Sequence, residues 1–186
     1  MLNTFVVHVE NKPGVLTRVS SLFRRRAFNI DSLTVGRTEK PEVSRMTITV
    51  DADVDQAKRI EASLYKLVNV LLVENITNDP MISRDLALIK VATTQETRGQ
   101  VLQLAQVFRA RVLDVAIDSI TVEITGNEEK IDRLLEMLTP YGILEMVRTG
   151  IVAMRRGKRT TNHDAPLEVM NEVGGEAVDD TAGMSV

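Results

Sequence analysis

The alternation between two hydrophobic periods constrains the fold of this chain more than any other feature. Apolar residues recur at every second position in stretches typical of strands, and at every third or fourth position in stretches typical of helices. In the first half the pattern predicts strand 2–10, helix 14–27, strands 29–39 and 43–50, a helix capped at 51–55 with its apolar stripe at 57–68, and strand 70–76. This order is β-α-β-β-α-β, the split βαβ or ferredoxin-like arrangement.

The same order recurs after Asn78-Asp79-Pro80, which interrupts the pattern. The elements predicted there are strand 86–91, helix 97–110, strands 112–117 and 119–125, helix 128–138 and a final strand 143–153. The two halves share the order of their elements more than their residues. We therefore expect an α+β fold of two ferredoxin-like βαββαβ units in tandem, with one domain at residues 1–79 and a second at residues 80–156.

Residues 157–186 differ in composition from both halves. They lack hydrophobic periodicity, are rich in Gly, Asp, Glu and Thr, and carry six acidic residues against only Lys158 and Arg159. A segment of this kind cannot bury enough apolar surface to order itself. We expect a disordered acidic tail that keeps the chain soluble, with an interaction arm as the alternative.

The composition argues against several classes of function. The formal net charge of -3 offers no basic face for nucleic acid. The chain has no cysteine, so disulfides, thiolate catalysis and cysteine zinc sites are excluded. The N-terminus enters a strand pattern without the layout of a signal peptide, and no apolar run is long enough to span a bilayer. We expect a cytoplasmic protein without a nucleic-acid or membrane partner.

The sequence motifs of common enzyme classes are missing. There is no P-loop, no G-x-G-x-x-G after a strand, no H-E-x-x-H and no G-x-S-x-G. His8 lies in a predicted strand, where a lone histidine is more typical of a surface or interface than of a general base, and His163 lies in the tail. We expect no catalytic residue and no metal site, although a small enzyme of ferredoxin-like fold stays an open alternative.

The strongest candidate for a functional site is Asn11-Lys12-Pro13-Gly14-Val15-Leu16, between the first predicted strand and helix. A helix that begins at a Pro-Gly turn leaves backbone N–H groups without partners, and the positive end of its dipole favours an anion such as a carboxylate. No reactive side chain stands beside the turn. The simpler structural reading is that Gly14 permits a tight turn and Asn11 stabilises it.

Asn29, which follows the first predicted helix, favours the binding hypothesis. The first helix of a ferredoxin-like unit runs back along the sheet, so Asn29 need not lie near Asn11 within one chain. If two units pair edge to edge, Asn29 of one can approach the turn of the other. An amide offers a carbonyl to an ammonium group and an N–H to a carboxylate, and Val15, Leu16 and Ile30 would add an apolar wall. The residues thus predict a pocket for a small aliphatic zwitterion that exists only when two units associate.

Two stretches carry a resemblance to a known family. Residues 4–16, Thr-Phe-Val-Val-His-Val-Glu-Asn-Lys-Pro-Gly-Val-Leu, resemble the opening of an ACT domain, a small regulatory module that binds amino acids. Residues 26–36, Arg-Ala-Phe-Asn-Ile-Asp-Ser-Leu-Thr-Val-Gly, are similar to the small regulatory subunit of acetohydroxyacid synthase (acetolactate synthase). The resemblance includes residues 85–91, which open the second half, and ends near Arg156, so it does not cover the tail.

The resemblance implies a non-catalytic regulatory subunit of branched-chain amino-acid biosynthesis. Such a subunit binds the large catalytic subunit, raises its activity and confers feedback inhibition by valine. Thiamine diphosphate, FAD and magnesium are then expected on the catalytic partner, and no cofactor on this chain. An ACT-type amino-acid-sensing module that regulates a different enzyme or a transcription complex is the alternative. The effector sites would lie between the paired ACT domains of a homodimer, at positions matching Asn11, Gly14, Val15, Leu16, Asn29 and Ile30.

Overall fold

The structure is a computed structural model that describes residues 1–157 of the 186-residue chain. The predicted disordered tail therefore lies outside the described residues, apart from Gly157. The first half contains β1 (Leu2–Glu10), α1 (Val15–Arg25), β2 (Ile30–Arg37), β3 (Val43–Asp51), α2 (Val54–Tyr65) and β4 (Val70–Asn75). The second half contains β5 (Met81–Ala92), α3 (Arg98–Val107), β6 (Arg111–Val115), β7 (Ser119–Gly126), α4 (Glu128–Leu138), the short 3-10 helix η1 (Thr139–Tyr141), β8 (Ile143–Arg148) and β9 (Val152–Arg155).

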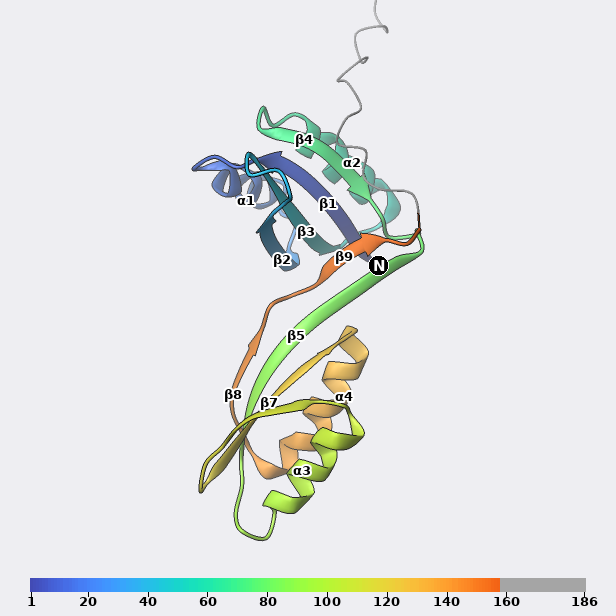
Figure 1. Cartoon of the computed structure of the whole chain (residues 1–186). Helices are drawn as coiled ribbons and strands as arrows, with labels where there is room; N and C mark the ends of the chain where they lie inside the picture. The colour runs from blue at the N-terminus through green and yellow to red at the C-terminus, as the bar shows by residue number, and fades with distance from the viewer. Residues whose placement is uncertain (158–186) are drawn as a thin grey trace, which may run out of the picture.

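The N-terminal unit, β1 to β4 with α1 and α2, is an antiparallel sheet covered on one face by its two helices (Figure 1). The strand order is β2-β3-β1-β4, so β2 and β4 are the edges. Alternate residues of the strands and one stripe of each helix meet in a core that includes Phe5, Val7, Val19, Phe23, Ile48, Ile60 and Leu64, each at most 1% exposed. This unit has the predicted βαββαβ order.

The start of α2 shows why the helix begins where it does. The Asp53 carboxylate accepts the backbone N–H of Gln56, and the Gln56 side chain accepts the backbone N–H of Asp53. Such a capping box satisfies two of the donors that every helix start leaves unpaired. In α4 the side chain of Asn127 accepts the N–H of Lys130 in the same role.

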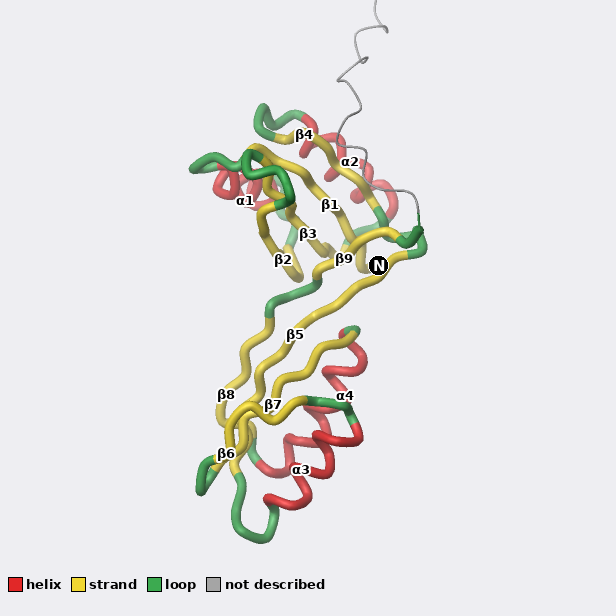
Figure 2. Tube along the Cα trace, viewed as in Figure 1, coloured by secondary structure: helices red, strands yellow, loops and turns green. Residues whose placement is uncertain are grey.

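The C-terminal unit, β5 to β8 with α3 and α4, repeats this architecture with the strand order β6-β7-β5-β8 (Figure 2). Its helices cover one face of the sheet and bury a second core that includes Ala87, Ile89, Val91, Val101, Ile120, Ile131 and Leu134. The expectation of two ferredoxin-like units in tandem is confirmed. No helix within residues 1–157 combines the length and the apolar character needed to cross a membrane. The domain limits at 79/80 and 156/157 stay predictions.

The end of the second half differs from the single strand expected over 143–153. That stretch is divided into β8 and β9 because Thr149 and Gly150 interrupt it. The Thr149 hydroxyl accepts the backbone N–H of Leu86 at 3.2 Å, and Gly150 adopts a left-handed conformation with φ +82°. The chain then leaves the C-terminal sheet.

Beyond this break, β9 pairs with the first residues of β5, which begins at Met81 and not at residue 86. The ribbon formed by Met81–Arg84 of β5 and by β9 lies beside the face of the N-terminal sheet that carries no helix (Figure 1). There Ala153 packs against Val6 and Ile76, all at most 3% exposed. Strand β9 therefore returns to the unit in which the chain began.

Candidate functional site

The turn before α1 holds the backbone in the form that the Pro-Gly sequence predicts. Gly14 is the residue before the helix, with φ +84° and ψ -7°, and no side chain caps the helix there. Within residues 1–157, the backbone N–H groups of Gly14, Leu16 and Thr17 have no acceptor, while Val15 donates to the Lys12 carbonyl over a long 3.4 Å. The first turn of α1 contains no acidic residue to neutralise the positive end of the helix dipole.

The space in front of this turn is open. A Cβ built on Gly14 would meet no atom within 4 Å. Free donors, a positive helix end and open space together suit a small anion such as a carboxylate.

Asn11 holds the turn against the loop between β2 and β3. Its backbone N–H donates to the carbonyl of Glu42 at 2.7 Å, and its side-chain amide donates to the carbonyl of Pro41 at 2.9 Å. The side chain is exposed, and its amide oxygen remains available to a ligand. Within one chain, Asn11 therefore positions the turn.

Val15 and Leu16 have different surroundings, although they are neighbours in the sequence. The Val15 side chain is 4% exposed and belongs to the core of the N-terminal unit, so it anchors the first turn of α1. The Leu16 side chain is 43% exposed and forms an apolar surface beside the free N–H groups. Of the two, Leu16 is the side chain that a ligand on this chain could contact.

Asn29 and Ile30 lie at the opposite end of the sheet from the turn. Ile30 is paired with Val50, which in turn is paired with Asn3 near the start of β1, whereas Asn11 follows the end of β1. Ile30 is half-buried against the core, while Asn29 is exposed and makes no side-chain hydrogen bond within residues 1–157. The structure thus brings residues 11–16 together and places residues 29–30 apart from them in one chain.

A polar network beside the turn could not be found from the sequence. The Asn69 side chain accepts a hydrogen bond from Arg18 of α1 at 2.6 Å and donates one to Glu10, whose carboxylate also binds Lys12 at 3.0 Å. Asn69 is far from these residues in the sequence, and no local motif marks it. The network joins both ends of the turn to the segment between α2 and β4.

The hydrogen bond from Asn69 and the one from Lys12 hold the pKa of Glu10 below its usual value. Because this pKa is lower in the folded state, the stabilisation is present above the unfolded-state pKa and is lost as the pH falls through the folded-state pKa. Asn69→Ala is expected to raise the pKa of Glu10, as measured by an NMR titration of its side-chain carboxyl carbon. Lys66→Ala, an exposed change nearby, should leave that titration unchanged. An unchanged Glu10 pKa in Asn69→Ala would contradict the assignment of the cause.

At the equivalent turn of the C-terminal unit, more of the backbone N–H groups find acceptors within the chain. The hydroxyls of Thr94 and Thr97 each accept the other's backbone N–H, at 3.2 and 2.9 Å. In the first turn of α3, the backbone N–H groups of Arg98 and Gln100 donate to backbone carbonyls. Of the first three residues of the helix, Gly99 alone has a backbone N–H without an acceptor within residues 1–157. The negative charge of Glu96 also lies just before the start of α3, where it would repel a carboxylate. This second turn is a poorer place for a carboxylate than the turn at Gly14.

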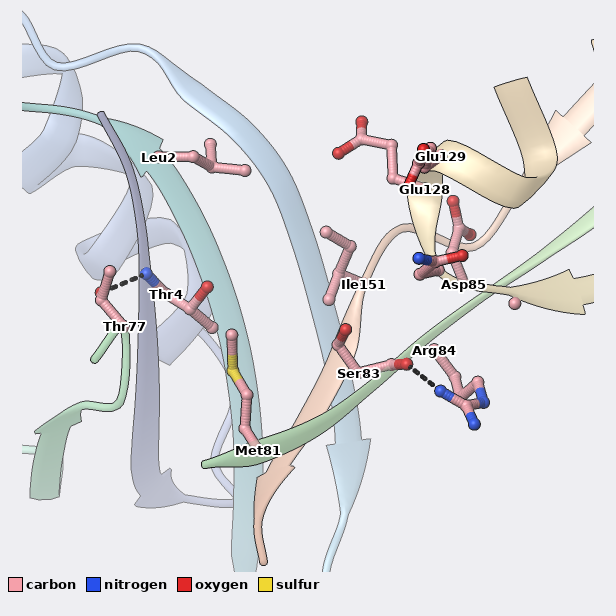
Figure 3. A pocket seen from close by; sticks show the side chains of 12 residues that line it. Leu2, Thr4, Thr77, Met81, Ser83, Arg84, Asp85, Glu128, Glu129 and Ile151 are labelled. Atoms are coloured by element: carbon pink, nitrogen blue, oxygen red, sulfur yellow. Dashed lines mark hydrogen bonds between the residues drawn. The ribbon is translucent and has the colours of Figure 1, made fainter. Parts of the chain in front are cut away.

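A separate cleft of about 340 Å³ lies between the two units (Figure 3). Leu2, Thr4, Thr77 and Met81 line it on one side, and Asp85, Glu128 and Glu129 line it on the other. The Asp85 carboxylate is bound by Arg148 and by Thr149, so it is not placed as a free acid or base. Across residues 1–157, no group of three or more His, Asp or Glu could hold a metal ion.

Comparison with known proteins gives matches over both units. A family model described as an AHAS small subunit-like ACT domain matches residues 5–72, and one described as the small subunit of acetolactate synthase matches residues 84–157. The acetolactate synthase small subunit of Mycolicibacterium smegmatis is 49% identical over 157 residues, which cover 84% of this chain and 92% of that protein. The probable acetolactate synthase small subunit of Archaeoglobus fulgidus is 47% identical over 159 residues, which cover 86% of this chain and 99% of that protein.

A solved structure agrees with these matches. The crystal structure of the acetolactate synthase small subunit from Thermotoga maritima superposes with a TM-score of 0.79 at 38% identity, covering 85% of this chain and 99% of that one. The similarity therefore extends over almost the whole length of these relatives. The resemblance read from the N-terminal turn and the residues after α1 is confirmed: this chain belongs to the acetolactate synthase small-subunit family.

Proposed function

We propose that this chain is the non-catalytic regulatory subunit of an acetolactate synthase. It binds the catalytic subunit, raises its activity and makes it sensitive to inhibition by valine. The observation that carries the proposal is the open start of α1, where the N–H groups of Gly14, Leu16 and Thr17 are unpaired beside a residue without a side chain. Thiamine diphosphate, FAD and magnesium belong in this proposal to the catalytic partner, and the complex to the cytoplasm.

In this proposal the valine carboxylate occupies the turn. It accepts hydrogen bonds from the free N–H groups, and the helix dipole adds to the attraction. The isopropyl group lies on the exposed side chain of Leu16 and on Ile30 of a second copy of the chain. The ammonium group binds the Asn29 side-chain carbonyl of that second copy.

The edge position of β2 supports a homodimer that would complete the site. Within residues 1–157, the outer edge of β2 pairs with no strand, so it can pair with another chain. If two copies of β2 pair antiparallel about a twofold axis, the start of one strand lies beside the end of the other. The end of β2, at Arg37, precedes the loop that Asn11 binds. Asn29 of one copy would therefore reach the turn of the other.

A site shared by two copies gives valine a means of control. Valine binds only the paired arrangement, so it shifts the protein toward that arrangement by its difference in affinity. The catalytic subunit then responds to the arrangement and not to valine itself.

The direct test is to mix the full chain with an acetolactate synthase catalytic subunit and to measure acetolactate formation with and without valine. The catalytic subunit alone should be slower and should not respond to valine, whereas the mixture should be faster and inhibited by valine. A mixture with the activity of the catalytic subunit alone would refute the proposal.

Asn29→Ala is expected to weaken valine binding by about tenfold, because it removes one hydrogen bond to the charged ammonium group. Isothermal titration of the full chain with valine measures this change. Stimulation of the catalytic subunit should stay at the wild-type level. Asn78→Ala removes another exposed amide that makes no side-chain hydrogen bond within residues 1–157 and serves as the control. Equal affinities of the two variants would exclude Asn29 from the site.

A further inference from the structure

The strand β5 belongs to the C-terminal sheet and also to the ribbon that packs beside the N-terminal sheet. Its first residues, Met81–Arg84, pair with β9 beside the N-terminal sheet, and the rest pair with β7 and β8 in the C-terminal sheet. The chain between β8 and β9, residues 149–151, runs alongside and passes close to β2. Hydrogen bonds thus join β2 to this connection.

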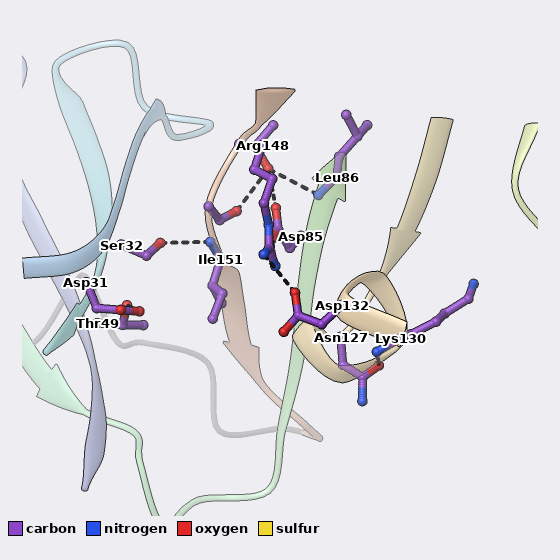
Figure 4. A network of polar contacts seen from close by, with 12 residues as sticks. Asp31, Ser32, Thr49, Asp85, Leu86, Asn127, Lys130, Asp132, Arg148 and Ile151 are labelled. Atoms are coloured by element: carbon purple, nitrogen blue, oxygen red, sulfur yellow. Dashed lines mark hydrogen bonds and ion pairs between the residues drawn. The ribbon is translucent and has the colours of Figure 1, made fainter. Parts of the chain in front are cut away.

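Two side chains of β2 hold a single residue of the connection. The Ser32 hydroxyl accepts the backbone N–H of Ile151 at 2.9 Å, and the Thr34 hydroxyl donates to the Ile151 carbonyl at 2.9 Å. Figure 4 shows Ser32 reaching across to Ile151. Leu33, between them in sequence, packs toward the core on the other face. We call the three residues Ser32, Thr34 and Ile151 the clasp.

Gly150 shows how closely the two segments approach. It has φ +82°, and a Cβ built on it would lie 2.6 Å from Oγ of Ser32 and 3.4 Å from Cγ2 of Thr34. Only a residue without a side chain fits both the conformation and the space. The contact with β2 thus depends on a glycine as well as on two hydroxyls.

The residues just before the clasp are fixed to the C-terminal unit. The Thr149 N–H donates to the Leu86 carbonyl at 3.0 Å. Arg148 binds the buried Asp85 of β5 at 2.8 Å through Nε and binds Asp132 of α4 at 2.9 Å (Figure 4). Hydrogen bonds therefore attach one end of residues 148–151 to β2 and the other end to β5 and α4, and the backbone of these four residues joins the two ends.

We propose that the clasp transmits the state of the effector site to the C-terminal unit. This inference rests on the proposed function, because β2 is the strand at which two copies would pair around valine. Pairing and valine binding displace β2, and the clasp passes the displacement to residues 148–151 and on to α4. Ser32 and Thr34 are positioning residues in this proposal and do not contact valine.

The test is the double substitution Ser32→Ala/Thr34→Val in the full chain, which removes both hydrogen bonds and keeps similar side-chain volumes. Valine affinity, measured by calorimetry, and stimulation of the catalytic subunit should both stay within about twofold of wild type. The maximal inhibition by valine should fall by about fivefold or more, because binding no longer reaches the C-terminal unit. In wild type, valine should change the hydrogen exchange of the Ile151 amide, and in the variant it should not.

The control double variant is Ser119→Ala/Thr125→Val on β7, which removes two hydroxyls that make no hydrogen bond within residues 1–157. Gly150→Ala is a second test of the clasp, because its Cβ would push residues 149–151 away from Ser32. Its matched control is Gly157→Ala, which has φ +79° but open space around its Cβ. Gly150→Ala should lose valine inhibition, and Gly157→Ala should retain it.

The outcomes separate the two proposals. If wild type binds no valine or leaves the synthase unchanged, the proposed function fails, and the clasp fails with it. If wild type is inhibited and both the double variant and Gly150→Ala are inhibited equally, the clasp alone is refuted. A joint loss of valine affinity and inhibition in the double variant would also refute it, since the hydroxyls would then belong to the effector site.

Discussion

Gly14→Asp is expected to raise the dissociation constant for valine by about a hundredfold or more, which corresponds to about 2.7 kcal/mol. The new carboxylate would lie in the open space where the ligand carboxylate is proposed to bind. Two such charges about 4 Å apart repel by about 4 kcal/mol at an effective dielectric constant near 20. The same carboxylate would also take the favourable position at the helix dipole. In the assembled synthase, the variant should stimulate the catalytic subunit but leave it insensitive to valine.

Gly14→Asn is the matched control for this prediction. Asn has the shape of Asp and tolerates the left-handed conformation about as well, but it carries no charge. We expect it to weaken valine binding by about tenfold or less. The difference between the two variants isolates the charge from the strain at φ +84°. Calorimetry with valine measures both, and a Gly14→Asp synthase inhibited at the wild-type valine concentration would contradict the site.

Arg148→Ala is expected to lower the free energy of unfolding by about 3–5 kcal/mol, because it leaves a buried carboxylate without its partner. The Asp85 side chain is 2% exposed, and Arg148 binds it through Nε at 2.8 Å and through a second nitrogen at 2.7 Å. Burial would lower the pKa of Arg148, but the hydrogen bonds and the charge of Asp85 raise it, so the guanidinium stays charged. Urea unfolding followed by circular dichroism measures the loss.

Two further variants test the cause of this loss. Asp85→Val/Arg148→Met replaces both charges with apolar groups and should cost less than Arg148→Ala, since no buried charge is left over. Arg133→Ala breaks an exposed ion pair with Glu129 on α4 and should cost about 0.5 kcal/mol or less. A double variant as unstable as Arg148→Ala would show that the loss comes from packing and not from the unpaired charge.

Hydrophobic periodicity was enough to predict most of the fold, because each unit buries one face of its sheet and one stripe of each helix. It could not predict the division between β8 and β9. The apolar residues on either side of Thr149 and Gly150 continue the alternation, while the break depends on contacts with Leu86 and Ser32. Such contacts join segments far apart in the chain and leave no local pattern.

In the candidate site, too, some features follow from the local sequence and others depend on the tertiary fold. The conformation of Gly14 follows from its local sequence, so the free N–H groups could be predicted. The burial of Val15 depends on which side of α1 faces the sheet at its first turn, and the contact of Asn69 with Glu10 and Arg18 depends on the tertiary fold. Asn29 lies at the opposite end of the sheet from the turn within one chain, and its proposed approach to the turn of a second copy depends on assembly, which a single sequence does not encode locally.

The packing of β9 beside the first sheet also makes each half of this chain depend on the other. Val6 and Ile76 are covered by Ala153 and by neighbouring Met81 and Ile151, all of which come from the second half of the chain. A chimera that joins the first half of one relative to the second half of another would have to match these contacts as well as the covalent junction. A mismatch there would expose part of this buried cluster, even though each half has a fold of its own.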